Sequence, residues 1–272
     1  MDSALKQRVI TGIVLIALVL LGVLIPTPPI FAIFSLIVII TLAGLEWARL
    51  VALTELNRTL FISGLLAISV LVYWSGELRW FFNVLGVIIW LILLVILAIY
   101  EKDTQLYKEN IWLLRLAAFL VLIPAWSSLI TLQQFYPSLL LYLIFLIAIA
   151  DSAAYFSGRS FGKTKLAPEL SPGKTREGVL GGLAAATLWA ILGAAFLGLP
   201  GSDWLFFIFL SMMVALMSVA GDLFESLLKR EADEKDSGSI LPGHGGILDR
   251  IDGLLAALPL FTLGVFWGGI QI

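Results

Sequence analysis

The chain has 272 residues, of which 60% are hydrophobic and 13% charged, and its mean hydropathy is +1.03. These values lie far outside the range of soluble globular proteins and indicate a polytopic membrane protein. The net charge of −2 argues against a nucleic-acid partner, and the absence of cysteine excludes disulfides and thiolate metal sites.

Nine apolar runs are long enough, or nearly so, to cross a membrane, so we expect an all-α fold of about nine transmembrane helices. They cover residues 9–25, 30–45, 59–75, 80–100, 111–132, 138–150, 179–199, 204–220 and 251–270. The second and sixth runs are short and should extend into flanking polar residues. The first run resembles a signal peptide, but no small-residue cleavage site precedes Pro26, so we expect a retained span.

The distribution of Lys and Arg predicts the orientation of these spans. If the N-terminus, with Lys6 and Arg8, is cytoplasmic, 16 of the 17 basic residues fall on the cytoplasmic side, and only Arg79 lies outside. This distribution follows the positive-inside rule. It places the two longest polar connections, residues 151–178 and 221–250, together on the cytoplasmic face.

The position of these two loops suggests a division of the chain. Residues 1–137 would form N-terminal membrane helices, spans one to five, and residues 138–272 would form a catalytic membrane region with spans six to nine. The compact length and the absence of a transit peptide favour a bacterial inner membrane.

The first loop is basic and rich in glycine, a composition that suits phosphate binding. Its small residues would let backbone N–H groups approach an anion, and the helix that starts near Gly178 would add its N-terminus. The charge-assisted donors would be Arg159, Lys163, Lys165, Lys174 and Arg176. The sequence GKT occurs twice here, but no GxxxxGK[ST] frame follows a strand, so a Walker A motif is excluded. The alternative is a basic loop that rests on anionic lipid headgroups.

The second loop combines both signs of charge. Asp222, Ser226 and Lys229 share one helix face by their i, i+4, i+7 spacing. Asp249 and Asp252 are three residues apart at the start of the last span. Carboxylates that converge there would repel one another unless a cation lay between them. Oxygen ligands without cysteine favour a hard ion such as Mg²⁺.

Each of these residues also has a purely structural interpretation. Asp249 could be a helix N-cap, Asp252 a capping-box partner, and Glu225 with Lys229 an i, i+4 pair on a solvated helix end. The PGHGG stretch at residues 242–246 favours the functional interpretation, because a loop that flexible can wrap a ligand and a cap does not require it. His244 within it is either a phosphate donor or merely exposed.

These residues resemble the signature of the phosphatidate cytidylyltransferase (CDP-diacylglycerol synthase) family. The matching positions are Ser226, Lys229, Arg230, Lys235, Asp236, Gly238, Pro242, His244, Gly245, Gly246, Asp249, Arg250 and Asp252. The first loop is similar to a second region of the family at Asp151, Ala154, Tyr155, Gly158, Arg159, Gly162, Lys163, Pro168 and the run SPGKTREG. Gly173 departs from the pattern, since many members carry a second lysine there.

The resemblance implies transfer of CMP from CTP to phosphatidic acid, giving CDP-diacylglycerol and pyrophosphate, with Mg²⁺ as cofactor. The sequence leaves open whether a second, monovalent cation also binds. The resemblance further implies a homodimer. The expected catalytic residues are Asp222, Asp249 and Asp252, which would hold the metal, with Lys235 and Arg250. The expected substrate-binding residues are Lys174, Thr175, Arg176, Ser226, Lys229, Arg230, His244, Gly245 and Gly246.

Three other functions compete with this interpretation. A cytidylyltransferase for another lipid, or a CTP-dependent lipid kinase, could use a similar basic loop and Mg²⁺; the kinase would release CDP instead of pyrophosphate. A secondary transporter is the alternative from another class. The charged residues cluster at one face, and few of them lie inside the spans. This distribution argues against a polar transport pathway across the membrane.

Overall fold

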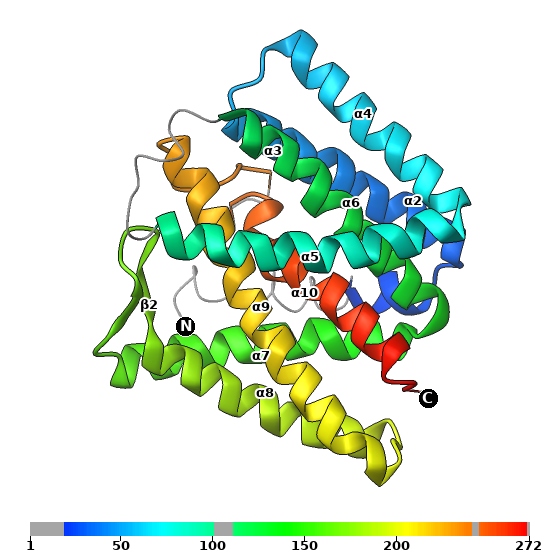
Figure 1. The fold of residues 1–272 in the computed structure, drawn as a ribbon, viewed down its shortest axis with the longest axis vertical. Coiled ribbons are helices and arrows are strands. Elements are labelled where there is room, and N and C mark those ends of the chain that lie inside the picture. Colours follow the sequence, from blue (N-terminus) through cyan, green and yellow to red (C-terminus); the bar gives the residue numbers. More distant parts are fainter. Residues whose placement is uncertain (1–18, 101–110, 241–244, 271–272) are drawn as a thin grey trace, which may run out of the picture.

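The computed structural model describes residues 19–100, 111–240 and 245–270, and nearly all of this part is helical (Figure 1). The all-α prediction is therefore confirmed. The elements are α2 (Pro28–Ser35), the π-helix η1 (Leu36–Leu42), α3 (Ala43–Leu50), α4 (Glu55–Trp74), α5 (Gly76–Tyr100), α6 (Ile111–Phe135), α7 (Pro137–Phe161), β1 (Lys165–Ala167), β2 (Ser171–Thr175), α8 (Arg176–Phe196), η3 (Gly201–Asp203), α9 (Trp204–Glu231) and α10 (Leu248–Trp267).

Eight helical segments of the described residues are long and apolar enough to cross a membrane, with α2, η1 and α3 forming one of them. The chain is thus a multi-pass membrane protein. The first predicted span, residues 9–25, lies largely outside the described residues, so the count of nine and the orientation stay predictions. The expected extension of the short second and sixth runs is confirmed, because α2 to α3 covers Pro28–Leu50 and α7 covers Pro137–Phe161.

Two helices continue well past their apolar runs, which corrects the predicted loops. Because α7 ends at Phe161, the connection predicted at residues 151–178 shrinks to residues 162–175. Because α9 ends at Glu231, the second connection covers residues 232–247. A helix satisfies its own backbone hydrogen bonds in lipid and in water alike, so hydropathy marks where the membrane ends and not where the helix ends.

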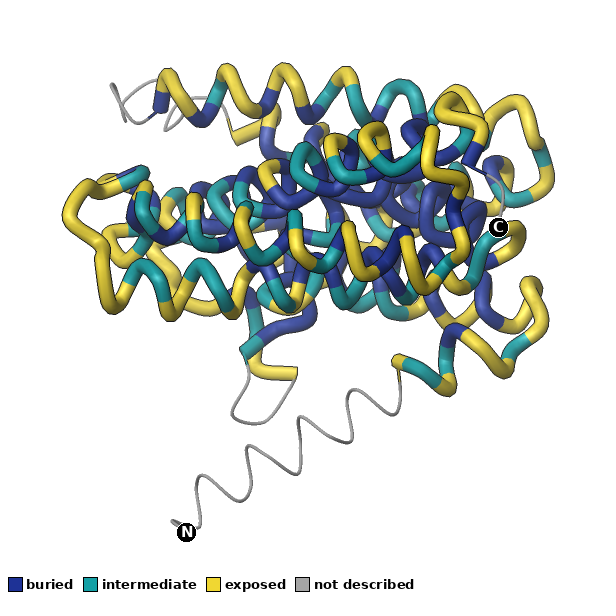
Figure 2. Tube along the Cα trace, turned by 90° about the horizontal axis from the view of Figure 1, so that it is seen from below, coloured by how far each residue is buried: buried dark blue, intermediate teal, exposed yellow. Residues whose placement is uncertain are grey.

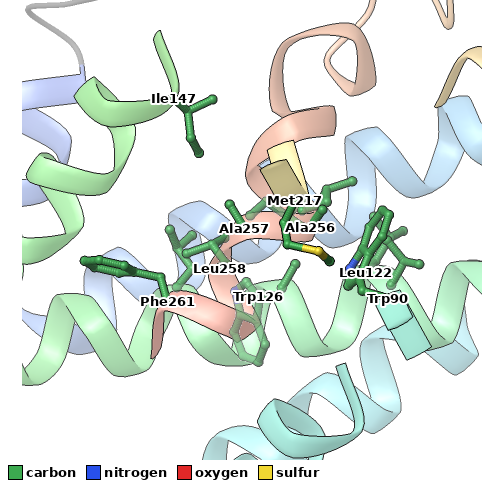
Figure 3. Close-up of a cluster of buried hydrophobic side chains, with 14 of the residues drawn as sticks. Trp90, Leu122, Trp126, Ile147, Met217, Ala256, Ala257, Leu258 and Phe261 are labelled. Atoms are coloured by element: carbon green, nitrogen blue, oxygen red, sulfur yellow. The ribbon is translucent and has the colours of Figure 1, made fainter. Parts of the chain in front are cut away.

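The core lies around α6 and α10. The most apolar stretch of α6 is 72% buried and that of α10 is 56% buried, against 22% for the peripheral α4. Trp90 of α5, Trp126 of α6 and Phe261 of α10 are among the large buried side chains (Figure 3). On the outer helices the exposed residues point away from this core, as the tube in Figure 2 shows. Many of these exposed residues have large apolar side chains, which suit contact with lipid.

Small residues allow α7, α8 and α9 to pack closely at the other side of the molecule, as is usual between membrane helices. Gly193 of α8 faces the ring of Tyr142 on α7. That ring is 5% exposed, and its hydroxyl lies 2.7 Å from the Ser211 hydroxyl on α9. Trp189 and Phe207 pack against the ring, and the contact with Ser211 holds its hydroxyl end.

Replacing Gly193 by alanine should therefore destabilise the fold, because the new Cβ would overlap the Tyr142 ring. Gly64 of α4 is a matched helical control, since a Cβ there would meet Phe119 at an ordinary 3.4 Å. We expect Gly193→Ala to be about 1–3 kcal/mol less stable than Gly64→Ala. Thermal unfolding in detergent measures this difference, and equal stability of the two variants would contradict the packing described here.

Candidate active site

A cavity of about 460 Å³ opens where α7, α8, α9 and α10 meet the β1–β2 hairpin. In Figure 1 the hairpin lies at the left edge of the molecule, beside the ends of α7 and α8. The charged residues of the cavity lining are Asp151, Arg159, Lys174, Asp222, Asp249 and Asp252. The structure thus brings the two polar connections of the sequence together at one end of the helices.

The crossing of α9 and α10 creates the centre of this site. A Cβ at Gly221 would overlap the backbone carbonyl of Asp252 and lie 3.0 Å from the Cα of Gly253. The absence of side chains at these two glycines lets the helix backbones approach closely. Asp222 on α9 and Asp252 on α10 are therefore held next to each other, as their positions in the sequence predicted.

Three carboxylates gather at this crossing. One oxygen each of Asp222, Glu225 and Asp252 lie within 4.8 Å of one another. Glu225 is only 4% exposed, and its Oε1 is buried with no hydrogen-bond partner. A buried carboxylate oxygen without a donor is costly. These three residues could hold a cation, and oxygen-only ligands suit a hard ion.

The charge of the surroundings is consistent with a divalent ion. The charged lining of the cavity together with Glu225 and Lys229 comprises five carboxylates and three cations, a formal charge of −2. One divalent cation would neutralise this excess. The residues present therefore fit the metal that the sequence predicted.

Lys229 lies between two carboxylates instead of facing open solvent. Its ammonium is 2.6 Å from Glu225 and 2.7 Å from Asp249, and its side chain is 15% exposed. The i, i+4 pairing of Glu225 with Lys229 is confirmed, but the pair is buried and not on a solvated helix end. Lys229 thus offsets part of the negative charge of the three carboxylates.

Asp249 is fully engaged in hydrogen bonds within the protein. Its Oδ1 accepts from Lys229, and its Oδ2 accepts from the backbone N–H and hydroxyl of Ser237 and from the N–H of Gly246 at 2.8 Å. Gly245, with φ of +79°, supplies the turn that leads into this contact. Asp249 is therefore bound to the loop before α10 and to α9 at once.

The hairpin brings Lys174 into the cavity from the opposite side. β1 and β2 are antiparallel, with Lys165 opposite Thr175. Lys174, next to this pair, forms an ion pair of 2.6 Å with Asp222. Lys174 is thus the residue of the basic loop that reaches the carboxylates directly.

The basic loop differs from the phosphate cradle expected from its glycines. The N–H groups of Lys163 and Thr164 donate to the carboxylate of Glu177, so they are occupied within the protein. Thr175 is the N-cap of α8, and its side-chain oxygen accepts from the N–H of Gly178 at 3.1 Å. The side chain of Thr175 has a structural role as a cap, while the residue also lines the cavity.

Other expected site residues are not among those that line the cavity. Arg176, Arg230, Lys235 and Arg250 are exposed and are not part of its lining. Ser226 is buried at 8% exposure on α9. Gly246 contributes its N–H to Asp249, and His244 lies outside the described residues.

Sequence reasoning missed three residues around the site. Glu225 was treated as an ordinary ion-pair partner, and Glu46 and Ser237 were given no role. Glu46 accepts from the N–H groups of Ile247 and Leu248, just before Asp249. A usable signal was present, because Glu46 is an acidic residue at the end of an apolar run, where charge is costly.

Comparison with known proteins identifies the family of the chain. A sequence model described as the cytidylyltransferase family matches residues 6–267. A protein of Haemophilus influenzae named phosphatidate cytidylyltransferase is 39% identical, with 97% of this chain and 99% of that protein covered. Proteins of the same name from Pseudomonas aeruginosa and Bacillus subtilis are 36% and 33% identical, covering 95% and 96% of this chain and 96% and 98% of their own lengths. The chain therefore belongs to the cytidylyltransferase family.

Proposed function

We propose that this protein transfers CMP from CTP to phosphatidic acid, giving CDP-diacylglycerol and pyrophosphate. The observation that carries the proposal is the cavity in which Asp222 and Asp252 meet Lys174, at one end of a bundle of apolar helices, with the buried carboxylate of Glu225 beside the two aspartates. Such a site can hold a polyanionic nucleotide next to a lipid phosphate. The names of the full-length relatives support this substrate pair.

The reaction forms one P–O bond and breaks another. A phosphate oxygen of phosphatidic acid attacks the α-phosphorus of CTP, and the bond to the β-phosphate breaks with its electron pair leaving on pyrophosphate. A phosphomonoester is largely a dianion at neutral pH, so the nucleophile needs no general base. The task of the protein is to bring two polyanions together in line and to neutralise their charge.

Asp222, Glu225 and Asp252 would hold Mg²⁺, with Asp249 keeping Lys229 and the first turn of α10 in place. When bound, the ion would neutralise charge on the triphosphate. Direct contact of Asp249 with the metal stays a prediction.

The basic residues would bind phosphate groups. Lys174 would do so from the hairpin, and Lys229 from α9. Arg176, Arg230, Lys235, Arg250 and His244 are the further phosphate-binding residues that we propose.

The lipid would approach from the side of α7, α8 and α9. A small hollow shares Asp151, Ala154, Val179 and Val219 with the cavity, and its remaining lining is mostly apolar. We propose that the acyl chains lie along this side, with the phosphate at the cavity. We propose that this end lies on the cytoplasmic side of a bacterial inner membrane, because the positive-inside rule assigns loops rich in Lys and Arg to that side; the homodimer stays a prediction.

Pyrophosphate release by the detergent-purified protein tests the proposal. The expected result is release that requires CTP, phosphatidic acid and Mg²⁺ together, with CDP-diacylglycerol recovered in equal amount. Release of CDP with a phosphorylated lipid would instead identify a kinase. No product from any of these substrates would overturn the proposal.

Lys174 should contribute more to nucleotide binding than its neighbour Arg176, because only Lys174 lines the cavity and contacts Asp222. We expect Lys174→Met to raise the KM for CTP about 10- to 100-fold, the loss of one charge-assisted hydrogen bond. Arg176→Met, which removes an exposed cation of the same loop, should have a smaller effect. Steady-state kinetics at saturating phosphatidic acid compare the two, and a larger effect of Arg176→Met would contradict this assignment.

A further inference from the structure

The N-terminal half of the chain places one buried acid beside the catalytic region. Glu46 lies on α3 and is 5% exposed. Its Oε1 accepts the N–H of Ile247 and its Oε2 the N–H of Leu248, both at 2.9 Å, where α10 begins. The N-cap residue Ile247 has no side-chain cap of its own. Glu46 therefore satisfies the first turn of α10 from a distant part of the chain.

Glu46 is also connected to Asp249 through one hydroxyl. The Ser237 hydroxyl lies 3.0 Å from Glu46 Oε2 and 2.9 Å from Asp249 Oδ2, and it accepts the N–H of Asp249 at 3.3 Å. A hydroxyl carries one proton, so the two carboxylates share it as donor. Since Asp249 in turn accepts from Lys229, a continuous path of hydrogen bonds leads from α3 to the carboxylates of α9.

The surroundings of Glu46 are shaped to hold it. A Cβ at Gly238 or at Gly246 would overlap its carboxylate. The neighbouring Trp47 anchors α3 by donating from Nε1 to the carbonyl of Leu114 at 2.9 Å. Arg49, one turn further, pairs with Glu234 in the loop after α9 at 3.4 Å.

This arrangement exceeds what a helix cap requires. Burying a carboxylate costs several kcal/mol unless every partner is in place. A serine, threonine or aspartate at the N-cap position would satisfy the first turn of α10 locally and without that cost. A long-range buried acid instead fixes where α10 begins relative to α3 and to the loop that carries Ser237.

We propose that Glu46 is a positioning residue for metal binding at the Asp222, Glu225 and Asp252 group. It would hold the first turn of α10 so that Asp252, one turn further along, faces the two acids of α9. The expected effect of Glu46 on catalysis rests on the proposed function. Glu46 itself touches no reacting atom.

Glu46→Gln tests this role, since it keeps the size of the side chain but replaces one acceptor oxygen by an amide NH₂ that faces N–H donors. We expect pyrophosphate release to fall about 10- to 100-fold and half-saturating Mg²⁺ to rise by a similar factor, as for other residues that orient metal ligands. Glu77→Gln, at an exposed acid in the first turn of α5, is the matched control and should behave as the wild type.

A second readout needs no activity. Mg²⁺ that binds the folded protein raises its Tm by an amount that grows with the ratio of the Mg²⁺ concentration to Kd, so the concentration needed for a fixed rise in Tm reports metal affinity without any reaction. Glu46→Gln should shift this concentration upward. If the wild type released no pyrophosphate, the proposed function would fail, while this thermal measurement would still decide the role of Glu46.

Ser237→Ala keeps the inference testable if Glu46→Gln does not fold. It removes the shared hydroxyl but leaves both bonds from Glu46 to α10, and it should shift the Mg²⁺ dependence in the same direction. Where both variants fold, the effect of the double variant should be smaller than the sum of the single effects. Wild-type Mg²⁺ dependence in folded Glu46→Gln, or in Ser237→Ala if Glu46→Gln is unfolded, would overturn the proposal.

Discussion

Asp252→Asn is expected to lower the rate of pyrophosphate release at least about 100- to 1,000-fold, equivalent to roughly 3–4 kcal/mol of transition-state stabilisation. The carboxylate of Asp252 shares the crossing of α9 and α10 with Asp222 and Glu225, and the three together form the candidate metal-binding group. The amide preserves shape but removes one charge from the proposed ligands. The measurement is the initial rate at saturating CTP and phosphatidic acid over a series of Mg²⁺ concentrations.

Asp203→Asn provides a control for this substitution. Asp203 directly precedes α9 at the end away from the cavity and accepts a hydrogen bond from Ser202, so its loss should leave the rate unchanged. A normal rate and normal Mg²⁺ dependence in Asp252→Asn would remove it from the metal site. If Asp249→Asn then abolished the rate, the ion would have to bind nearer to Asp249 and Lys229.

The sequence was sufficient to predict the parts of the fold that depend on local composition. Apolar runs marked the membrane helices, and the two charged connections were expected on one face, where the cavity is found. Asp222 and Asp252 could be paired because each lies at the edge of a span, and the family signature pointed to the same region. These features follow from hydropathy and from helix periodicity, both of which are visible in one chain segment at a time.

What the sequence could not reveal depends on contacts between distant segments. Glu46 and Ser237 are 191 positions apart, and no local pattern links them. The spacing of Glu225 and Lys229 is the same whether the pair is solvated or buried; only the approach of α10 makes it a buried pair. The arrangement of the basic loop depends on such a contact too, because the carboxylate of Glu177, in the first turn of α8, occupies the N–H groups of Lys163 and Thr164.

Lys229→Met should have the largest effect on stability of any change considered. The substitution removes the ammonium shared by Glu225 and Asp249, whose side chains are 5% and 9% exposed, and leaves two carboxylates buried near each other. Removing one partner from a buried ion pair typically costs about 3–5 kcal/mol. We expect a loss of this size in the free energy of unfolding, measured in detergent without substrates or Mg²⁺.

The pair of Arg58 and Glu55 on α4 provides the comparison, because its separation is 3.8 Å and Glu55 is 96% exposed. Such a surface pair contributes about 0–1 kcal/mol, so Arg58→Met should be nearly neutral. The additional change Glu225→Gln should recover part of the stability lost in Lys229→Met, since it removes one of the two unpaired charges. If Lys229→Met instead kept wild-type stability and only raised the KM for CTP, phosphate binding would be the sole role of Lys229, and the charge balance of the site without substrate would have to come from elsewhere.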